Sequence, residues 1–186
     1  MHKEDGRVIW ITGLSGVGKT TLAQELIKLI IVTGEPVIHL DGDKLREIFG
    51  VVERNSQNYD RKARLGLAMK YSKLTNVLCS QGFTVVVSTI SMFNEIYDWN
   101  RTNLPNYFEV YLKIPLDELR RRDPKNIYNQ YDEGIIKNVA GLDLLVDEPL
   151  TADWQPEFQR DRTVSSLACE LNSILEEKIS ISKKQG

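Results

Sequence analysis

Four short apolar runs have the length and composition of buried β-strands. They cover residues 7–12, 37–40, 83–88 and 107–112. The third run is β-branched and almost continuously apolar, which is typical of a strand that is covered on both faces. We therefore predict that residues 83–88 form a central strand of a sheet.

Apolar residues at helical spacing lie between and after these runs. One predicted helix starts at Thr21, a second spans residues 60–80, and a last one covers residues 163–179. Strands that alternate with helices predict an α/β fold, in which a mostly parallel sheet lies between two helical layers. Residues 123–159 hold several glycines, prolines and polar residues, and we predict a mobile lid there. Residues 183–186 read as a frayed tail.

The composition indicates one domain that comprises residues 1–186, because 41% of the chain is apolar. The formal charge of −2 gives no cationic footprint for binding nucleic acid. No apolar window approaches the length of a membrane span and nothing resembles a signal peptide, so a cytoplasmic protein is predicted. Cys79 and Cys169 are far apart and have no histidine partners, which argues against a zinc site or a disulfide and predicts two buried thiols.

The segment after the first predicted strand carries the sequence G-x-x-x-x-G-K-T. A glycine-rich turn between a strand and a helix lets backbone N–H groups converge on phosphate oxygens, and the helix N-terminus adds its positive dipole end. The predicted nucleotide-binding residues are Gly13, Leu14, Ser15, Gly16, Val17, Gly18, Lys19, Thr20 and Thr21. Of these, Lys19 would reach the β- and γ-phosphates of ATP as a catalytic residue, and Thr20 would ligate Mg²⁺.

A second motif, Asp41-Gly42-Asp43 with Arg46, follows the second predicted strand. The carboxyl end of that strand should border the phosphate site. Phosphoryl transfer to a hydroxyl needs a carboxylate that takes the proton or holds metal-bound water, and cations around the transferring group. Asp41, Asp43 and Arg46 supply these groups. The structural alternative is that Asp41 begins a turn and Asp43 caps the next helix.

The order of these and later motifs closely resembles the adenylylsulfate kinases. Residues 9–23 and 40–46 carry the phosphate loop and the D-G-D motif. Further matching segments are residues 90–91, 108–116, 122–128 and 141–149. The resemblance implies a P-loop kinase that transfers the γ-phosphate of Mg-ATP to the 3′-hydroxyl of a small ribonucleotide. In this family that nucleotide is adenylylsulfate, in sulfate assimilation, and the kinase forms a homodimer.

By position, the resemblance also implies roles for single residues. Asp43 would act as the base or orient the acceptor, Asp41 would lie beside it, and Arg46 would bind the acceptor's phosphate. Arg122 and Asp143 fall in the family's ATP-adenine region. Further acceptor-binding positions are Arg61, Ile90, Ser91, Lys137 and Val139. The family has also been assigned a phosphoserine at the position of Ser91, although direct in-line transfer needs no covalent serine.

The chain departs from this family mainly on the acceptor side. The asparagine and paired arginines of the family's D-R-x-x-N-x-R-R motif do not align with residues 60–67, and the basic lid residues are replaced at 129–132. Lys44 replaces the usual asparagine, and Met92 replaces the proline of I-S-P. Val139 stands where a phenylalanine stacks on the acceptor's adenine, a contact worth roughly 1–3 kcal/mol. The ATP half is therefore better preserved than the acceptor half.

Three functions stay open. The first is a divergent adenylylsulfate kinase in which Tyr59, Phe93 or Tyr131 replaces the lost aromatic platform. The second is a cytidine diphosphoramidate kinase of a capsular phosphoramidate pathway, because such kinases resemble this family and a pyrimidine needs a smaller stacking surface. Phe93, Tyr97 and Trp99 fit a ligand role and the core of one helix equally well. The third is a regulatory module without transfer, which the retained D-G-D carboxylates disfavour.

Overall fold

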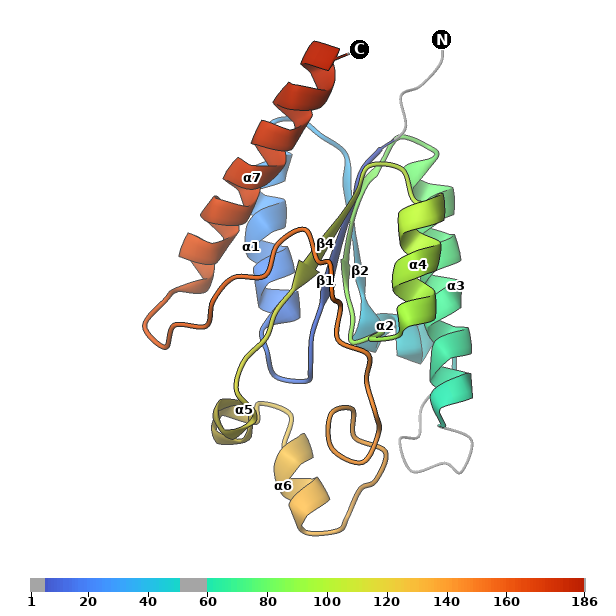
Figure 1. Cartoon of the computed structure of the whole chain (residues 1–186), viewed down its shortest axis with the longest axis vertical. Coiled ribbons are helices and arrows are strands. Elements are labelled where there is room, and N and C mark those ends of the chain that lie inside the picture. Colours follow the sequence, from blue (N-terminus) through green and yellow to red (C-terminus); the bar gives the residue numbers. More distant parts are fainter. Residues whose placement is uncertain (1–5, 51–59, 186) are drawn as a thin grey trace.

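A parallel sheet forms the centre of the molecule (Figure 1). The computed structural model describes residues 6–50 and 60–185, with side chains up to residue 180. Over these residues the strands are β1 (Val8–Thr12), β2 (Val37–Asp41), β3 (Thr84–Ser88) and β4 (Tyr107–Tyr111). They lie in the order β2-β3-β1-β4 and all pairs are parallel. The prediction that the third apolar run forms a central strand is confirmed.

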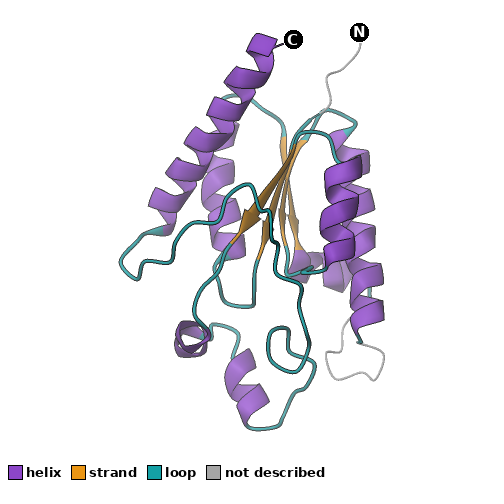
Figure 2. Cartoon of the chain, in the orientation of Figure 1, coloured by secondary structure: helices purple, strands orange, loops and turns teal. Residues whose placement is uncertain are grey.

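Helices cover both faces of the sheet and form the predicted three-layer αβα architecture (Figure 2). One face carries α1 (Lys19–Ile31) and α7 (Val164–Gln185), and the other carries α3 (Arg61–Cys79) and α4 (Asn94–Asn103). Toward the carboxyl ends of the strands lie α2 (Gly42–Ile48), α5 (Leu116–Arg122) and α6 (Ile127–Asp132). Among the described residues, no helix combines the length and the apolar character that a membrane crossing requires.

Local signals set where individual helices begin and end. The side chain of Asp60 accepts a hydrogen bond from the Ala63 N–H at 2.8 Å and caps the N-terminus of α3. Gly82, with φ of 82°, turns the chain between α3 and β3. The predicted helix over residues 60–80 is therefore confirmed to within one residue at each end. α7 continues to Gln185 and so includes most of residues 183–186, the segment predicted as a frayed tail.

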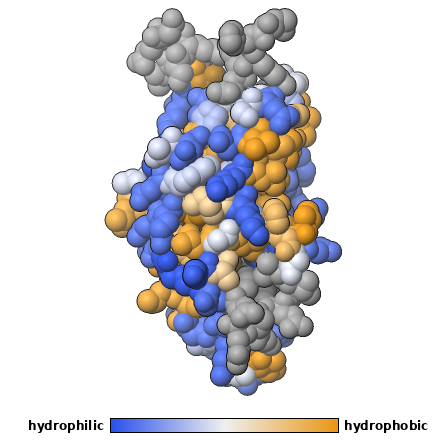
Figure 3. Space-filling model, turned by 90° about the vertical axis from the view of Figure 1, so that its right-hand side faces the viewer, coloured by the Kyte–Doolittle hydropathy of each residue, from blue (hydrophilic) through white to orange (hydrophobic). Residues whose placement is uncertain are grey.

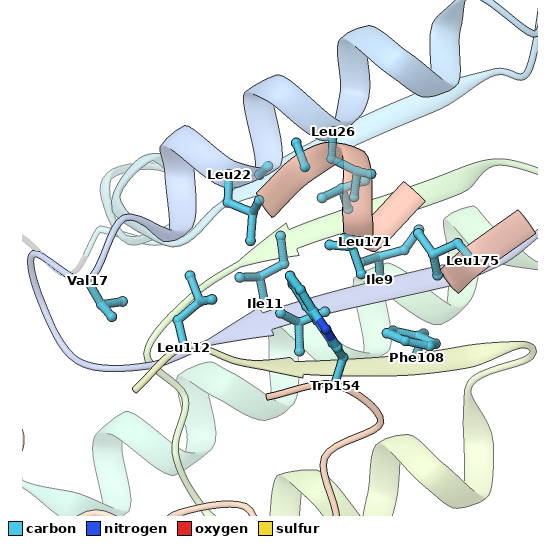
Figure 4. Packing of buried hydrophobic residues seen from close by; sticks show 14 of the residues in the cluster. Ile9, Ile11, Val17, Leu22, Leu26, Phe108, Leu112, Trp154, Leu171 and Leu175 are labelled. Atoms are coloured by element: carbon cyan, nitrogen blue, oxygen red, sulfur yellow. The ribbon is translucent and has the colours of Figure 1, made fainter. Parts of the chain in front are cut away.

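The apolar core between the sheet, α1 and α7 holds the phosphate-loop helix in place. Leu22 and Leu26 of α1 meet Leu171 of α7 over Ile9 and Ile11 of β1 (Figure 4). Each of these five side chains is at most 1% exposed. Burial of this much apolar surface stabilises the contact between helix and strand. It thereby positions the N-terminus of α1 at the carboxyl end of β1.

On the opposite face, aromatic side chains around the start of α4 belong to the core. Phe93 and Tyr97 are buried, and Trp99 packs against the cluster that contains Phe93. Of the two roles left open for these three residues, the structure shows the core role. The outward side of α3 and α4 is mixed, with apolar side chains gathered beside polar ones (Figure 3).

The two cysteines differ in their surroundings. Cys79 is buried as predicted, whereas Cys169 is exposed on α7. The prediction of a second buried thiol is therefore wrong. The reason is the helical period, because the buried stripe of α7 runs through Ala168, Leu171 and Leu175 and leaves residue 169 on the outer side.

The end of the predicted lid range is attached to the sheet. Trp154 forms a β-bridge with Val110 of β4, and its ring is buried in the core beside α7. Its backbone also exchanges hydrogen bonds with Glu109 and Tyr111. The segment predicted to be a mobile lid is therefore anchored to the sheet at Trp154.

Replacing Leu171 by alanine is expected to lower the free energy of unfolding by about 2–5 kcal/mol, because a fully buried leucine leaves a cavity between α7 and the sheet. Leu145→Ala is the matched control: this leucine is 88% exposed, and its loss should cost no more than about 0.5 kcal/mol. Urea unfolding followed by circular dichroism measures both. Equal effects of the two substitutions would contradict the packing role of α7.

Candidate active site

A cavity opens at the carboxyl ends of the strands and brings separate motifs together. It is bordered by the phosphate loop, the start of α2, the loop after β3 and the segment that follows α5. Parallel strands end at the same edge of a sheet, which explains why these segments meet. The predicted site residues that line the cavity are Ser15, Gly16, Gly18, Lys19, Thr20, Thr21, Asp41, Asp43, Arg46, Ile90 and Val139.

Glycine conformation shapes the phosphate loop. Gly13 and Gly18 have φ of 145° and 100°, a backbone region that residues with a side chain rarely adopt. A Cβ on Gly13 would also lie 2.4 Å from the Leu112 carbonyl oxygen, whereas one on Gly18 would meet no atom within 4 Å. Packing therefore requires glycine at position 13, and the backbone turn into α1 requires it at position 18.

The Lys19 ammonium folds back over this loop. Its Nζ donates hydrogen bonds to the carbonyl oxygens of Gly13 at 2.9 Å and Leu14 at 2.8 Å. Burial, followed by repulsion from Lys125 and Arg46, lowers the pKa of Lys19 to about 7. Lys19, Lys125 and Arg46 repel one another, and an anion bound between them would relieve this repulsion. The backbone N–H groups of the loop can donate hydrogen bonds to the oxygens of a phosphate.

Asp41 connects the phosphate-loop helix to α2. Its Oδ2 accepts hydrogen bonds from Thr20 Oγ1 at 2.7 Å and Ser88 Oγ at 3.0 Å. Its Oδ1 accepts from the Asp43 N–H at 2.9 Å, so Asp41 caps α2. The alternative in which Asp43 is the cap is wrong, because Asp43 already lies within the helix. Burial would raise the pKa of Asp41, but the hydrogen bonds from Thr20 and Ser88 outweigh it and hold the pKa below its usual value.

Asp43 lies in the first turn of α2, and its carboxylate borders the cavity. One oxygen pairs with Arg46, one helical turn further on, and the other pairs with Lys125 from the segment after α5. The side chain is 42% exposed. Two cations therefore hold an accessible carboxylate where an acceptor hydroxyl could reach it.

Arg122 borders a second, smaller hollow beside the phosphate loop. Its guanidinium lies 5.4 Å from the centre of the Phe158 ring, and its Nε donates to Glu118 at 2.8 Å. Val17 and Gly18 of the loop line the same hollow, and Gly18 also lines the main cavity. A guanidinium beside an aromatic ring at the rim of a partly apolar hollow suits a planar base. Arg122 therefore stays the predicted contact of the ATP adenine.

Ser91 and Arg61 are among the predicted acceptor-binding residues that do not line the cavity. Ser91 is buried, and its Oγ lies 2.9 Å from Thr89 Oγ1. Arg61 donates two hydrogen bonds to Glu95, at 3.0 and 3.1 Å, and one to Asp147 at 2.9 Å. In this arrangement Arg61 links α3, α4 and the 123–159 segment.

Asp143 acts on the lid region rather than on either hollow. It accepts hydrogen bonds from the backbone N–H groups of Asn138 at 2.8 Å and Val139 at 2.6 Å. It therefore holds the turn that presents Val139 to the cavity. Lys137 precedes this turn, is exposed, and does not line the cavity.

Two cations that line the cavity were not selected from the sequence. Arg64 lies three residues after Arg61 on α3, and Lys125 lies in the R-D-P-K segment. The spacing of the two arginines places them near each other on the helix surface, so the pattern carried a signal for both. The ion pairs of Arg61 direct it to Glu95 and Asp147, whereas Arg64 reaches the cavity.

The Thr20 hydroxyl is suited to bind Mg²⁺ together with a nucleotide. Thr20 gives its proton to Asp41, which leaves the lone pairs of its hydroxyl oxygen for a metal ion. Over the ranges 6–50 and 60–185, no group of three or more His, Cys, Asp or Glu side chains could hold a metal ion. Phosphate oxygens and water would therefore complete the coordination, as is usual for Mg²⁺ in nucleotide sites.

The fold and the site together define a P-loop kinase, and comparisons with known proteins identify its family. The sequence profile described as Adenylylsulphate kinase matches residues 5–156. The chain belongs to this family and is an ATP-dependent kinase. The alternative of a regulatory module without transfer is therefore not supported.

Individual relatives carry two different names. A "Cytidine diphosphoramidate kinase" of Campylobacter jejuni is 44% identical over 79% of this chain and 84% of its own length. An "Adenylyl-sulfate kinase" of Chloroflexus aurantiacus is 36% identical over 80% of this chain and 77% of its own. The APS kinase of Mycobacterium tuberculosis, solved with AMPPNP and APS, has a TM-score of 0.81 at 28% identity and covers 92% of this chain and 98% of its own.

When Mg-ATP binds at pH 8, the protein is expected to bind about one proton, or somewhat less, for each nucleotide. The pKa of Lys19 is about 7 in the free protein, so the amine is mostly neutral at pH 8, and phosphate oxygens raise its pKa. Calorimetry in buffers of different ionisation enthalpy measures the uptake. Lys19→Arg is the control, because arginine is already protonated and should show none. Uptake of the same size in both proteins would place the proton elsewhere.

Proposed function

We propose that the protein transfers the γ-phosphate of Mg-ATP to the 3′-hydroxyl of cytidine diphosphoramidate. The main support is the composition of the cavity: none of its lining residues within the described part of the chain is aromatic. Val139 stands at the position where adenylylsulfate kinases stack a phenylalanine on the acceptor's adenine. A pyrimidine offers a smaller stacking surface and depends less on such a ring. The 44% identity to the Campylobacter jejuni kinase points the same way.

The aromatic residues considered as substitute platforms do not change this conclusion. Phe93 is buried, and the Arg61 guanidinium covers its ring at 5.2 Å. Tyr131 packs against the cluster that contains Val139 and does not line the cavity. Tyr59 lies outside the described residues. Neither described ring can stack on an acceptor base without leaving its present contacts.

In the proposed reaction, the acceptor's 3′-oxygen forms a bond to the γ-phosphorus while the bond from that phosphorus to the bridging oxygen of ADP breaks. The hydroxyl proton passes to the carboxylate of Asp43. Lys19 and the loop N–H groups bind the β- and γ-phosphates, and Arg46 and Arg64 bind the acceptor's diphosphoramidate group. Mg²⁺, when held by Thr20, neutralises charge on the phosphates.

Adenylylsulfate is the second candidate acceptor. The APS kinase solved with AMPPNP and APS shares this fold closely, and the family profile covers most of the chain. The choice between the two acceptors rests on the lid turn and α3, whereas the ATP side is common to both. The homodimer and the cytoplasmic location also stay proposals.

ADP release with Mg-ATP and each acceptor in parallel tests the proposal. We expect kcat/KM for cytidine diphosphoramidate to exceed that for adenylylsulfate by at least about tenfold, the size of one missing stacking contact. Val139→Phe should move this ratio toward adenylylsulfate, whereas Val139→Leu adds bulk without a ring and should not. Mass spectrometry confirms 3′-phosphorylation. Preference of the wild-type protein for adenylylsulfate would overturn the choice of acceptor and indicate tolerated divergence within sulfate activation.

Asp43→Ala is expected to lower kcat by at least about a hundredfold, because the transferred proton loses its acceptor. The affinity for ATP should change by less than about threefold, since Asp43 does not belong to the phosphate loop. Steady-state kinetics and calorimetry measure the two effects. Asp98→Ala removes an exposed carboxylate on α4 that does not line the cavity and serves as the control. Full transfer by the Asp43 variant would show that another group takes the proton.

A further inference from the structure

A chain of hydrogen bonds runs from the edge strand β2 to the phosphate-loop helix. His39 on β2 lies with its Nε2 2.9 Å from Ser88 Oγ on β3. Ser88 Oγ donates to Asp41 Oδ2 at 3.0 Å, and Thr20 Oγ1 donates to the same oxygen at 2.7 Å. His39 itself does not line the cavity. The histidine therefore reaches the active site only through other side chains.

The direction of each hydrogen bond follows from the groups present. Asp41 Oδ2 is an acceptor for both the Thr20 and the Ser88 hydroxyl groups, so the single hydroxyl proton of Ser88 points to Asp41. Ser88 Oγ can then only accept from His39. Burial lowers the pKa of His39, so its ring is neutral and carries one N–H. That N–H must be on Nε2.

We propose that His39 is a positioning residue for the nucleotide and Mg²⁺ side of the active site. Its Nε2–H keeps the Ser88 hydroxyl oriented as a donor to Asp41. The carboxylate held in this way accepts the proton of Thr20, whose oxygen lone pairs then face the place where it would ligate Mg²⁺. The proposal concerns the kinase reaction itself and does not depend on which nucleotide is the acceptor.

Strand pairing restricts the relay, which is the chain of hydrogen bonds His39–Ser88–Asp41–Thr20. Asp41 and Ser88 are register partners in the β2–β3 pair. A Cβ on Gly42 would approach Thr89 Oγ1 to 3.0 Å and the Ser88 carbonyl oxygen to 3.2 Å, so the start of α2 lies close against the end of β3. Rotation of the Asp41 carboxylate would break its contact with Thr20 and uncap α2 together. If the His39 N–H no longer orients the Ser88 hydroxyl, we therefore expect the positions of Asp41 and Thr20 in the active site to be affected.

Imidazole ¹⁵N chemical shifts of the unliganded protein test the first link. The chain has two histidines, His2 and His39, so a His2→Gln variant leaves one ring to observe. We expect His39 in that variant to carry its proton on Nε2, and the ratio of the two tautomers to change after Ser88→Ala. A dominant Nδ1–H tautomer would overturn the proposal, because Ser88 would then donate to His39 instead of Asp41.

Paired substitutions test the consequence for metal binding. His39→Leu removes the donor at similar volume, whereas His39→Gln keeps an N–H that can reach Ser88. In calorimetric titrations of Mg²⁺ into the protein with ADP, the leucine variant should need about three- to tenfold more Mg²⁺ for half saturation, as expected for one lost hydrogen bond. The glutamine variant should stay within about twofold of wild type. The Mg²⁺ dependence of turnover should shift in parallel, with KM for the acceptor unchanged.

Val37→Ala is the matched control for a purely structural effect. Val37 lies two residues before His39 on the same face of β2 and outside the relay. This variant should lower thermal stability without a shift in the Mg²⁺ dependence. The proposal is overturned if His39→Leu behaves like Val37→Ala, or if the glutamine variant is as impaired as the leucine variant. It is also overturned if His39→Leu and Ser88→Ala have additive effects in the double variant.

Discussion

One ionised carboxylate holds the two halves of the active site in position. Asp41, the last residue of β2, accepts hydrogen bonds from Thr20 on α1, from Ser88 on β3 and from the first turn of α2. A carboxylate can accept about four hydrogen bonds, and the donors to Asp41 come from three different elements, α1, β3 and α2. The group cannot turn toward one partner without losing another. Asp41 therefore ties the phosphate-loop helix to α2, which carries Asp43.

Cationic side chains line the cavity, and the unliganded protein neutralises their charge only in part. Lys19 is half-buried near Arg46 and Lys125, and it donates hydrogen bonds to backbone carbonyl oxygens of the phosphate loop. The carboxylate of Asp43 forms ion pairs with the other two cations, Arg46 and Lys125. A polyanion offers all of them stronger, charge-assisted hydrogen bonds. Preorganised sites commonly carry such a cost in the unliganded state.

The two halves of the site are built on different parts of the fold. The phosphate loop joins β1 to α1, both anchored in the core, so its geometry follows from the packing of that core. The proposed acceptor side is formed by α3 and by the turn that Asp143 holds, which lie outside the sheet. Segments of this kind tolerate change more easily. Under the proposed function, the valine at position 139 therefore alters the choice of acceptor while leaving the ATP side intact.

Local patterns in the sequence predict the strands, the phosphate loop and the ends of α3. These features depend on neighbours in the chain, through the apolar period, glycine conformation and the cap at Asp60. The folded arrangement was needed to show that Arg64 rather than Arg61 reaches the cavity, that Phe93 belongs to the core, and that His39 contacts Ser88. The physical reason is that such contacts join residues far apart in sequence. They follow from strand order and helix packing, which no local pattern encodes.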